Sequence, residues 1–427
     1  MPNQQNHNHL QRKLGPFSLT NLVIANMIGT GIFTTSGLIM QNLHHPLLMI
    51  GLWVIAGIIA LSGALCYAQL GTVFPQAGGE YIFLSRLYHP LLGFLTGWIS
   101  FVVGFSAPIA ASSLAASSYV IRACPHLMEM AHIFGIQESG LLIKIFALII
   151  ILTLTAVHVG GVSFGTRIQN GLTLLKIIFI IGLLLAGFLW GQGDLAHFIP
   201  QESFSFNLSG WRMNRNLPLS LILGTMVVTG LYLALNVLFV YAVPPAEMEG
   251  VLAIGGLAVR YLFGSSLETY FSLFIALALL SSISAFIILG PRIYYAMARE
   301  GYFFRFAAKV GSSSHTPFLA IIIQSALAAI MVLTGTFDQI LTYIGFSLGI
   351  FPILAVLSVF KLKKHFSTKF FLPAYPLPPI LFASVSIIIL TLTFMQRPVE
   401  SGIASGVVLA GIPAYLLFKK KNLQKHL

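Results

Sequence analysis

The sequence has few charged residues for its length. Only 8% of its 427 residues are charged, whereas 57% are hydrophobic. This composition excludes a soluble domain, which could not hide so much apolar surface from water. The apolar runs continue for about 20 residues or more, the length a helix needs to cross a bilayer, whereas barrel strands are shorter and alternate. The sequence therefore predicts an all-α polytopic membrane protein.

Cysteines and catalytic groupings are also scarce. The two cysteines, Cys66 and Cys124, are too few for a disulfide framework, and we interpret them as small buried hydrophobic residues. The 11 acidic residues lie in loops or at span edges, which argues against a buried carboxylate relay. His44 and His45 have no third ligand, so we predict no metal site. With no nucleophile or acid–base pair either, we predict neither an enzyme nor a cofactor.

The basic residues do not indicate a nucleic-acid partner. The net charge of +12 comes from Lys and Arg in short loops between apolar runs, as in membrane proteins whose basic loops face the cytoplasm. The head, from Met1 to Gly15, is polar and basic and has no cleavable signal pattern. We therefore expect the first span to remain as a helix.

About eleven spans are predicted from the apolar runs. Gly29 and Gly31 lie in the middle of the first, where the backbone must bend or approach another group closely. Residues 191–216 are polar and contain no stretch long enough to cross a bilayer. The predicted spans are 18–40, 47–72, 90–121, 140–160, 163–190, 217–243, 268–291, 316–335, 338–360, 374–395 and 401–418.

The basic loops indicate one crossing that hydropathy does not supply. Lys and Arg gather on the cytoplasmic side of short loops. If the N-terminus is inside, eleven spans place the basic clusters at 292–309, 361–369 and 419–425 outside. One further crossing within 191–216 brings all three inside. We therefore expect both termini to face the cytoplasm from the cell inner membrane, with 191–216 crossing as irregular backbone.

Lys176 is the one ionisable residue placed near the middle of a span. It lies in the apolar run from Val162 to Trp190. A Lys at that depth costs at least ~2.5 kcal/mol on insertion scales, so it normally faces a partner or a wet cavity. We expect it to face such a partner or cavity. The alternative is a Lys that snorkels or that joins two helices.

Several groups of residues occur in an order typical of one transporter family. They are Ile28–Phe33, Cys66–Gly71 leading to Pro75 and Gly78–Tyr81, Gly97-Trp98, Gln169-Asn170 followed by Lys176, and Arg292–Gly301. Over nearly its whole length the chain resembles the amino acid–polyamine–organocation superfamily of permeases, nearest to the bacterial and L-type amino acid transporter branch. The resemblance implies twelve helices, the first ten forming two inverted five-helix repeats. It also implies that helices one and six are broken around the substrate.

The chain departs from this family where the charge pattern needs a crossing. In the family a sixth helix carrying a Ser-Gly-Trp-like segment runs on to an acidic residue and an Arg-Asn-Leu-Pro, but here Ser209-Gly210-Trp211 is followed at once by Arg212–Pro218. We therefore predict that most of helix six is missing. The predicted layout of the single transporter domain is a tail at 1–17, a five-helix repeat at 18–190, a polar segment at 191–216, the rest of the second repeat at 217–360, two terminal helices at 374–418 and a basic tail at 419–427.

The resemblance implies a substrate site at the break of the first helix, formed by Ile28, Gly29, Thr30, Gly31 and Ile32. Backbone N–H groups freed by the break would hold a substrate carboxylate. The alternative reading is a close-packing glycine pair. Lys176 would lie beside the break, where sodium-coupled relatives of the fold hold a cation, and would act in coupling or gating.

Ser281, Ser282 and Trp98 are candidates to support this site, and Tyr232 could line a cavity. However, serines in the middle of a span usually bond their own helix backbone, and aromatic residues in spans usually pack or form belts.

Two functions remain open. The first is an amino acid permease that works by alternating access as a secondary active transporter, by proton symport or exchange, and that is impaired by the missing helix. The second is a non-transporting remnant or accessory membrane protein of the same fold. The expected partners are an amino acid substrate, protons and the lipid bilayer.

Overall fold

The protein is a helical bundle, seen here in a computed structural model. The described part of the chain contains helices and no strand, and this confirms the predicted all-α polytopic membrane fold. The structure describes residues 16–29, 31–33, 35–76, 78–124, 126–133, 139–198, 219–251, 254–311, 316–365 and 371–426.

The long helices agree with the predicted spans. Within the described residues, 9 helices are long and apolar enough to cross a membrane. The 17-residue α14 (Phe318–Thr334) and a divided first span complete the predicted set. The others are α3 (Pro46–Val73), α5 (Pro90–Ile99) joined through π-helical η2 (Ser100–Gly104) to α6 (Ser106–Ala123), α8 (Ser139–Val159), α9 (Val162–Trp190), α10 (Leu219–Ala242), α13 (Glu268–Arg299), α15 (Phe337–His365), α16 (Leu377–Gln396) and α17 (Pro398–His426).

The first span is interrupted, as the two glycines predict. Its first half is α1 (Pro16–Met27) and its second half is α2 (Thr35–Leu43). Between them the chain bends and makes a single 3₁₀ turn, η1 (Gly31–Phe33). Thr30 lies outside the described residues.

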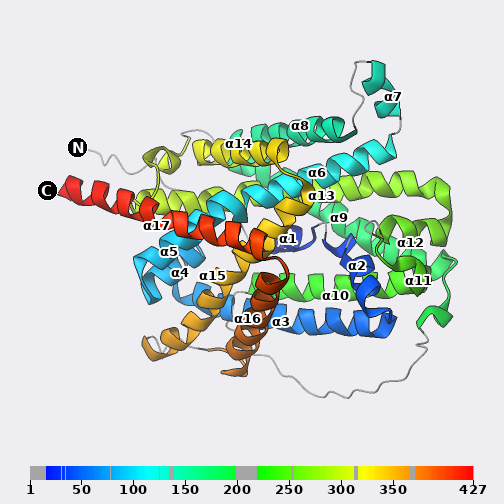
Figure 1. Ribbon diagram of the computed structural model, residues 1–427, viewed down its shortest axis with the longest axis horizontal. Coiled ribbons are helices and arrows are strands. Elements are labelled where there is room, and N and C mark those ends of the chain that lie inside the picture. The colour runs from blue at the N-terminus through cyan, green and yellow to red at the C-terminus, as the bar shows by residue number, and fades with distance from the viewer. Residues whose placement is uncertain are drawn as a thin grey trace.

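Short helices lie at both ends of the bundle and were not predicted. In Figure 1, α7 (His126–Ile133), α11 (Pro245–Met248) and α12 (Ile254–Phe263) lie at the right end, and α4 (Glu80–Leu87) lies toward the left end with the last turns of α17. Single 3₁₀ turns are η3 (Leu195–Phe198), η4 (Ser265–Leu267) and η5 (Arg305–Ala308).

Helix α13 also continues beyond its predicted end at residue 291. The additional turns contain Tyr294 and Met297, which are fully buried. Packing against neighbouring helices, rather than lipid, therefore sustains this part of the helix. Hydropathy does not detect it, because the segment carries Arg292 and Arg299.

Helices α9 and α10 run in the same direction. Tyr232 of α10 and Lys176 of α9 both reach the break of the first helix. Farther along, the rings of Phe188 and Tyr241 are 5.4 Å apart. The segment after α9 stays at this end, because Asp194 N donates to Tyr241 O at 2.9 Å.

Phe198 and Leu219 are the described residues on either side of 199–218, and they lie at opposite ends of α10. Helix α10 has 24 residues, so it is about 36 Å long. His197, next to Phe198, lies 3.2 Å from Tyr241 O near the last turn of α10, whereas Leu219 is the first residue of that helix. The predicted irregular crossing at 191–216 falls mostly outside the described residues.

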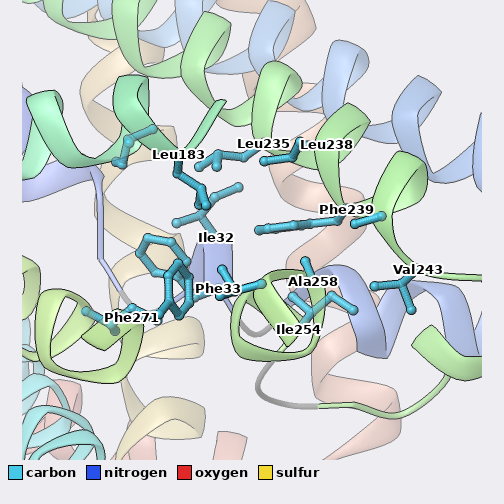
Figure 2. Packing of buried hydrophobic residues seen from close by; sticks show 14 of the residues in the cluster. Ile32, Phe33, Leu183, Leu235, Leu238, Phe239, Val243, Ile254, Ala258 and Phe271 are labelled. Atoms are coloured by element: carbon cyan, nitrogen blue, oxygen red, sulfur yellow. The ribbon is translucent and has the colours of Figure 1, made fainter. Parts of the chain in front are cut away.

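An apolar cluster covers one side of the break. Ile32 and Phe33 of η1 pack with side chains from α9, α10, α12 and α13, and Figure 2 shows them converging on the short helix α12. Ile254 and Ala258 of α12 are almost completely buried in this cluster. Helix α12 therefore closes the break from the end at which α9 and α10 finish.

Candidate functional site

The site begins where α1 ends, because a helix end leaves backbone carbonyls without helical partners. Ile28 N still donates to Ile24 O at 2.9 Å, and Gly29 N turns back to Met27 O at 3.1 Å. The carbonyls of Ala25, Met27 and Ile28 all accept hydrogen bonds from side chains of other helices. The C-terminal end of α1 also carries the negative end of the helix dipole, so it favours a cation.

Lys176 supplies that cation. Its side chain is 1% exposed. Nζ donates to Ile28 O at 2.7 Å, to Ala25 O at 3.3 Å and to Ser282 Oγ at 2.9 Å. An ammonium group has three donors, and here each has an acceptor. None of these acceptors carries a full charge, so helix-end carbonyls compensate the buried Lys.

The predicted serines contribute in different ways. Ser282 Oγ lies 2.7 Å from Ile28 O and 3.0 Å from Ala25 O, so its hydroxyl joins the same two carbonyls that Lys176 binds. The neighbouring Ser281 instead contacts Thr173 Oγ1 at 3.0 Å. Both serines bond to other helices, whereas mid-span serines usually bond their own backbone.

The residues of the break take up different environments. Ile28 and Ile32 are fully buried, so their side chains form core and only their backbone could meet a substrate. A Cβ placed on Gly29 would meet no atom within 4 Å, and one on Gly31 would meet only Thr35 Oγ1, at 3.5 Å. The two glycines therefore face open space and are not closely packed.

Trp98 is not brought to this site. Its indole N–H donates to Val407 O of α17 at 3.0 Å, and its ring stacks on Phe94 with centroids 6.4 Å apart. It packs in an apolar cluster separate from the one that holds Ile28 and Ile32. In this structure Trp98 joins the third span to the last helix.

Tyr232 has a larger part than its sequence position suggests. Its hydroxyl donates to Met27 O at 2.6 Å, and Trp53 meets its ring edge-on at 5.4 Å. Asn236, one turn later, accepts from Ser36 Oγ of α2 at 2.6 Å. Helix α10 therefore holds both halves of the broken helix. The sequence signal that could have indicated this role is a tyrosine and an asparagine one turn apart in an apolar span.

A second polar cluster lies at the α4 end of the bundle. Tyr67 donates to Glu80, Tyr81 donates to Glu300 at 2.5 Å, and Arg86 lies 3.7 Å from Glu300. Burial raises the pKa of Glu80, and the hydrogen bond from Tyr67 partly opposes this. These contacts fasten α4 to α3 and to the end of α13.

Comparison with known proteins identifies the family. A sequence model of amino acid permeases matches residues 14–213 and 203–417, which together cover most of the chain. The chain belongs to the amino acid permease family. The permease is therefore a multi-pass membrane protein, and the resemblance seen in its motifs is confirmed.

The relatives are named transporters and exchangers. The serine/threonine exchanger SteT of Bacillus subtilis (strain 168) is 29% identical over 449 positions, covering 97% of this chain and 98% of the relative. The human cystine/glutamate transporter is 26% identical and covers 98% of this chain and 87% of its own length. The human large neutral amino acids transporter small subunit 2 is 26% identical, with 96% and 80% covered.

The matches also show a discontinuity. The family model matches in two blocks that overlap at residues 203–213, inside the polar segment 191–216. The alignment to SteT has 449 positions, more than the 427 residues of the permease, so SteT has residues that this chain lacks.

Proposed function

We propose that the permease moves amino acids by secondary active transport with alternating access, and that Lys176 acts as its fixed coupling or gating cation. The observation that carries this proposal is the binding of the Lys176 ammonium to the last carbonyls of α1. A charge at this point links the first helix to α9 and α13. A change in its protonation would change how firmly α1, the first half of the broken helix, is held against α9 and α13.

The break itself supports binding of the substrate carboxylate. Gly29 and Gly31 leave space beside the backbone, and N–H groups at the start of α2 lie at the positive end of that half-helix. The names of the relatives include a serine/threonine exchanger. We therefore propose a small neutral or cationic amino acid as the substrate, carried by proton symport or by exchange.

We further propose that most of helix six is absent. Three observations support this: the polar composition of 191–216, the two-block family match, and the surplus of positions in the SteT alignment. The missing helix would have offered carbonyls and a negative dipole end to the substrate amino group. Without them, binding should be weaker by several kcal/mol, because the substrate ammonium lacks partners in a desolvated cavity.

Reconstitution into lipid vesicles tests this function. We expect uptake of radiolabelled serine or threonine to be weak or undetectable in the natural chain. It should recover when a family-like sixth helix is inserted between Gly210 and Arg212. Robust, saturable uptake that survives Lys176→Ala would contradict both the role of Lys176 and the importance of the gap.

The gap also favours a second function, a non-transporting or accessory protein of the same fold. Absence of uptake both with and without the inserted helix, in protein that folds normally by thermal shift, would favour this alternative.

The crossing at 191–216 is proposed on the charge pattern and on the positions of Phe198 and Leu219 at opposite ends of α10. About twenty extended residues can span ~66 Å, more than the length of α10. Ala196→Cys and Ser220→Cys, in a chain without Cys66 and Cys124, should react with a membrane-impermeant thiol reagent from opposite faces. Labelling of both from one face would indicate an ordinary loop.

From the same charge pattern we also propose that the protein lies in the inner membrane with both termini in the cytoplasm. Reporter fusions after Lys309 and at Leu427 should both report inside, because the basic clusters near them belong on that face. Outside signals at both positions would show that the second half of the protein is inverted.

A further inference from the structure

Unpaired polar atoms are buried in the first half of α9 and in α1. Gln169 is 1% exposed and Asn21 is 5% exposed. Gln169 Oε1 and Asn21 Nδ2 have no hydrogen-bond partner in the described part of the protein. Buried polar atoms are nearly always paired, by protein or by water, so each such atom requires an explanation.

The two atoms belong to the same stretch of the α1–α9 contact. Asn170 Nδ2 donates to Ser18 Oγ at 2.9 Å, and Lys176 Nζ donates to Ala25 O at 3.3 Å. The two helices are therefore parallel and joined at two levels. Asn21 lies between the two joined residues of α1, and Gln169 lies beside the first joined residue of α9. One atom is a donor and the other an acceptor, so a water between them can accept from Asn21 and donate to Gln169.

A row of uncharged groups continues from Gln169 toward Lys176. Gln169 Nε2 donates to Thr173 Oγ1 at 3.0 Å, Thr173 Oγ1 donates to Gln169 O at 2.9 Å, and Thr173 Oγ1 lies 3.0 Å from Ser281 Oγ. Thr173 is one turn before Lys176 on α9, and Ser281 precedes Ser282, the hydroxyl that Lys176 binds. We call Asn21, Gln169, Thr173 and Ser281 the polar row.

The ionisable groups on the surrounding helices either bond to other residues or lie away from Lys176 and the polar row. Tyr232 of α10 bonds Met27 O, and His158 of α8 bonds Ser284. Tyr261 of α12 bonds Glu247, and Arg167, which precedes the row on α9, is exposed. The described residues of α1 include no ionisable side chain. Among the described residues, no carboxylate contacts Lys176, so we look to water as its proton-exchange partner.

We propose that the polar row is a water-bearing path through which Lys176 exchanges protons with the side of the membrane at which α1 and α9 begin. This rests on the proposed coupling role of Lys176. At each step one N–H or O–H bond breaks as an O–H bond forms on the next oxygen. The ammonium thus becomes a neutral amine, and the proton leaves as hydronium. Asn21 and Gln169 hold the water, the Thr173 and Ser281 hydroxyl groups line its path, and water carries the proton away from the Lys176 ammonium.

Thiol labelling tests whether the row carries water. In a chain without Cys66 and Cys124, Thr173→Cys is compared with Leu174→Cys, the next residue, which lies at the same depth and is 49% exposed on the outside of the bundle. Methanethiosulfonate reagents react with the thiolate, which forms in water and not in lipid. Cys at 173 should therefore react about tenfold faster or more, and only from the side at which α1 begins. Equal rates, or labelling from the other side, would overturn the proposal.

Proton exchange at Lys176 tests the second half of the inference without requiring transport. In ¹⁵N-lysine-labelled protein, the Lys176 ammonium signal is assigned with Lys176→Arg. Its exchange rate with water should fall about tenfold or more in Thr173→Val, which keeps the shape and removes the hydroxyl. Lys144, which donates to Leu333 O on another helix, is the matched control and should not change. An unchanged rate at Lys176 would refute the relay.

The coupling role of Lys176 and the water-bearing path can be refuted separately. Uptake that survives Lys176→Ala would refute the coupling role while leaving the labelling result unaffected. Loss of uptake in Lys176→Ala, together with slow labelling at 173, would keep the coupling role and reject the path.

Discussion

Lys176 and His158 are both basic residues buried against a serine of α13, yet their surroundings differ. Lys176 meets Ser282 and two carbonyls at the negative end of α1. His158 is 3% exposed, and its Nε2 meets only the Ser284 hydroxyl, at 2.7 Å. The first site compensates a cation with a helix end, whereas the second satisfies a neutral ring.

The packing around His158 supports this difference. A Cβ on Gly165, at the start of α9, would lie 2.4 Å from His158 Nδ1, so the ring fills the space that the glycine leaves. Burial of an ionisable group therefore does not by itself indicate function. The groups that surround a buried ionisable residue decide whether it has a functional role. The following experiments test that distinction between Lys176 and His158.

The largest effect is expected for Lys176→Ala. It removes the ammonium from the Ala25 and Ile28 carbonyls, and we expect it to abolish net uptake in the version with an inserted sixth helix, which is the background for every uptake measurement below. Uptake in vesicles is the measurement, with Lys144→Ala as a control at a half-buried Lys outside the site. Retained uptake would show that Lys176, like His158, has no functional role in transport.

Ser282→Ala should have the next largest effect. It removes a hydroxyl that bonds the ammonium and the same two carbonyls, and hydrogen bonds to charged groups contribute about 1.5–3 kcal/mol. We expect a loss of about 2 kcal/mol in stability and a several-fold fall in uptake. Ser284→Ala is the matched control on the same helix, and an equal effect there would show that the two serines are equivalent.

Gly165→Ala tests the packing role of His158. The added methyl group must displace the ring, and overpacking of this kind costs about 1–3 kcal/mol; we expect the lower half of that range because the ring can tilt. The loss should appear as a lower Tm in detergent. A smaller side chain at His158 should restore stability in the double variant, and failure to do so would argue against simple packing.

The smallest effect is expected for His158→Gln, whose amide reaches the position of His158 Nε2. The amide can still bond Ser284, so stability should change by less than about 1 kcal/mol. The pH dependence of uptake should remain that of the unsubstituted protein. A shift in that dependence would give His158 a titrating role and bring it closer to Lys176.

Much of the fold was predictable because each helix has its own signal. Transfer from water to lipid depends on the residues of one segment, so hydropathy located the long helices to within a few residues at most ends. The exceptions are instructive. Helix α13 extends past 291 because Tyr294 packs on other helices, and α12 is too short and too polar at Arg260 to stand out.

The site was predictable only in part. Lys176 and the two glycines were visible because a buried charge and a mid-span break are unusual in any apolar run. Which of Ser281 and Ser282 bonds Lys176 could not be predicted. Adjacent helical residues point about 100° apart, and the rotation of α13 about its axis depends on its neighbours. Trp98 illustrates the same limit, since its partner Val407 is 309 residues away.

The sequence by itself determined the membrane class, the long spans, the break at Gly29 and Gly31, the polar segment at 191–216 and the isolated charge at Lys176. Tertiary structure decided that Lys176 meets the carbonyls of Ala25 and Ile28, that Tyr232 bonds Met27 O, and that α9 and α10 are parallel. The physical reason is the sequence range over which each effect acts. Hydropathy and helix breaking act within one segment, whereas the contacts of Lys176 and Tyr232 with α1 join residues 148 to 205 positions apart and exist only after the helices have packed.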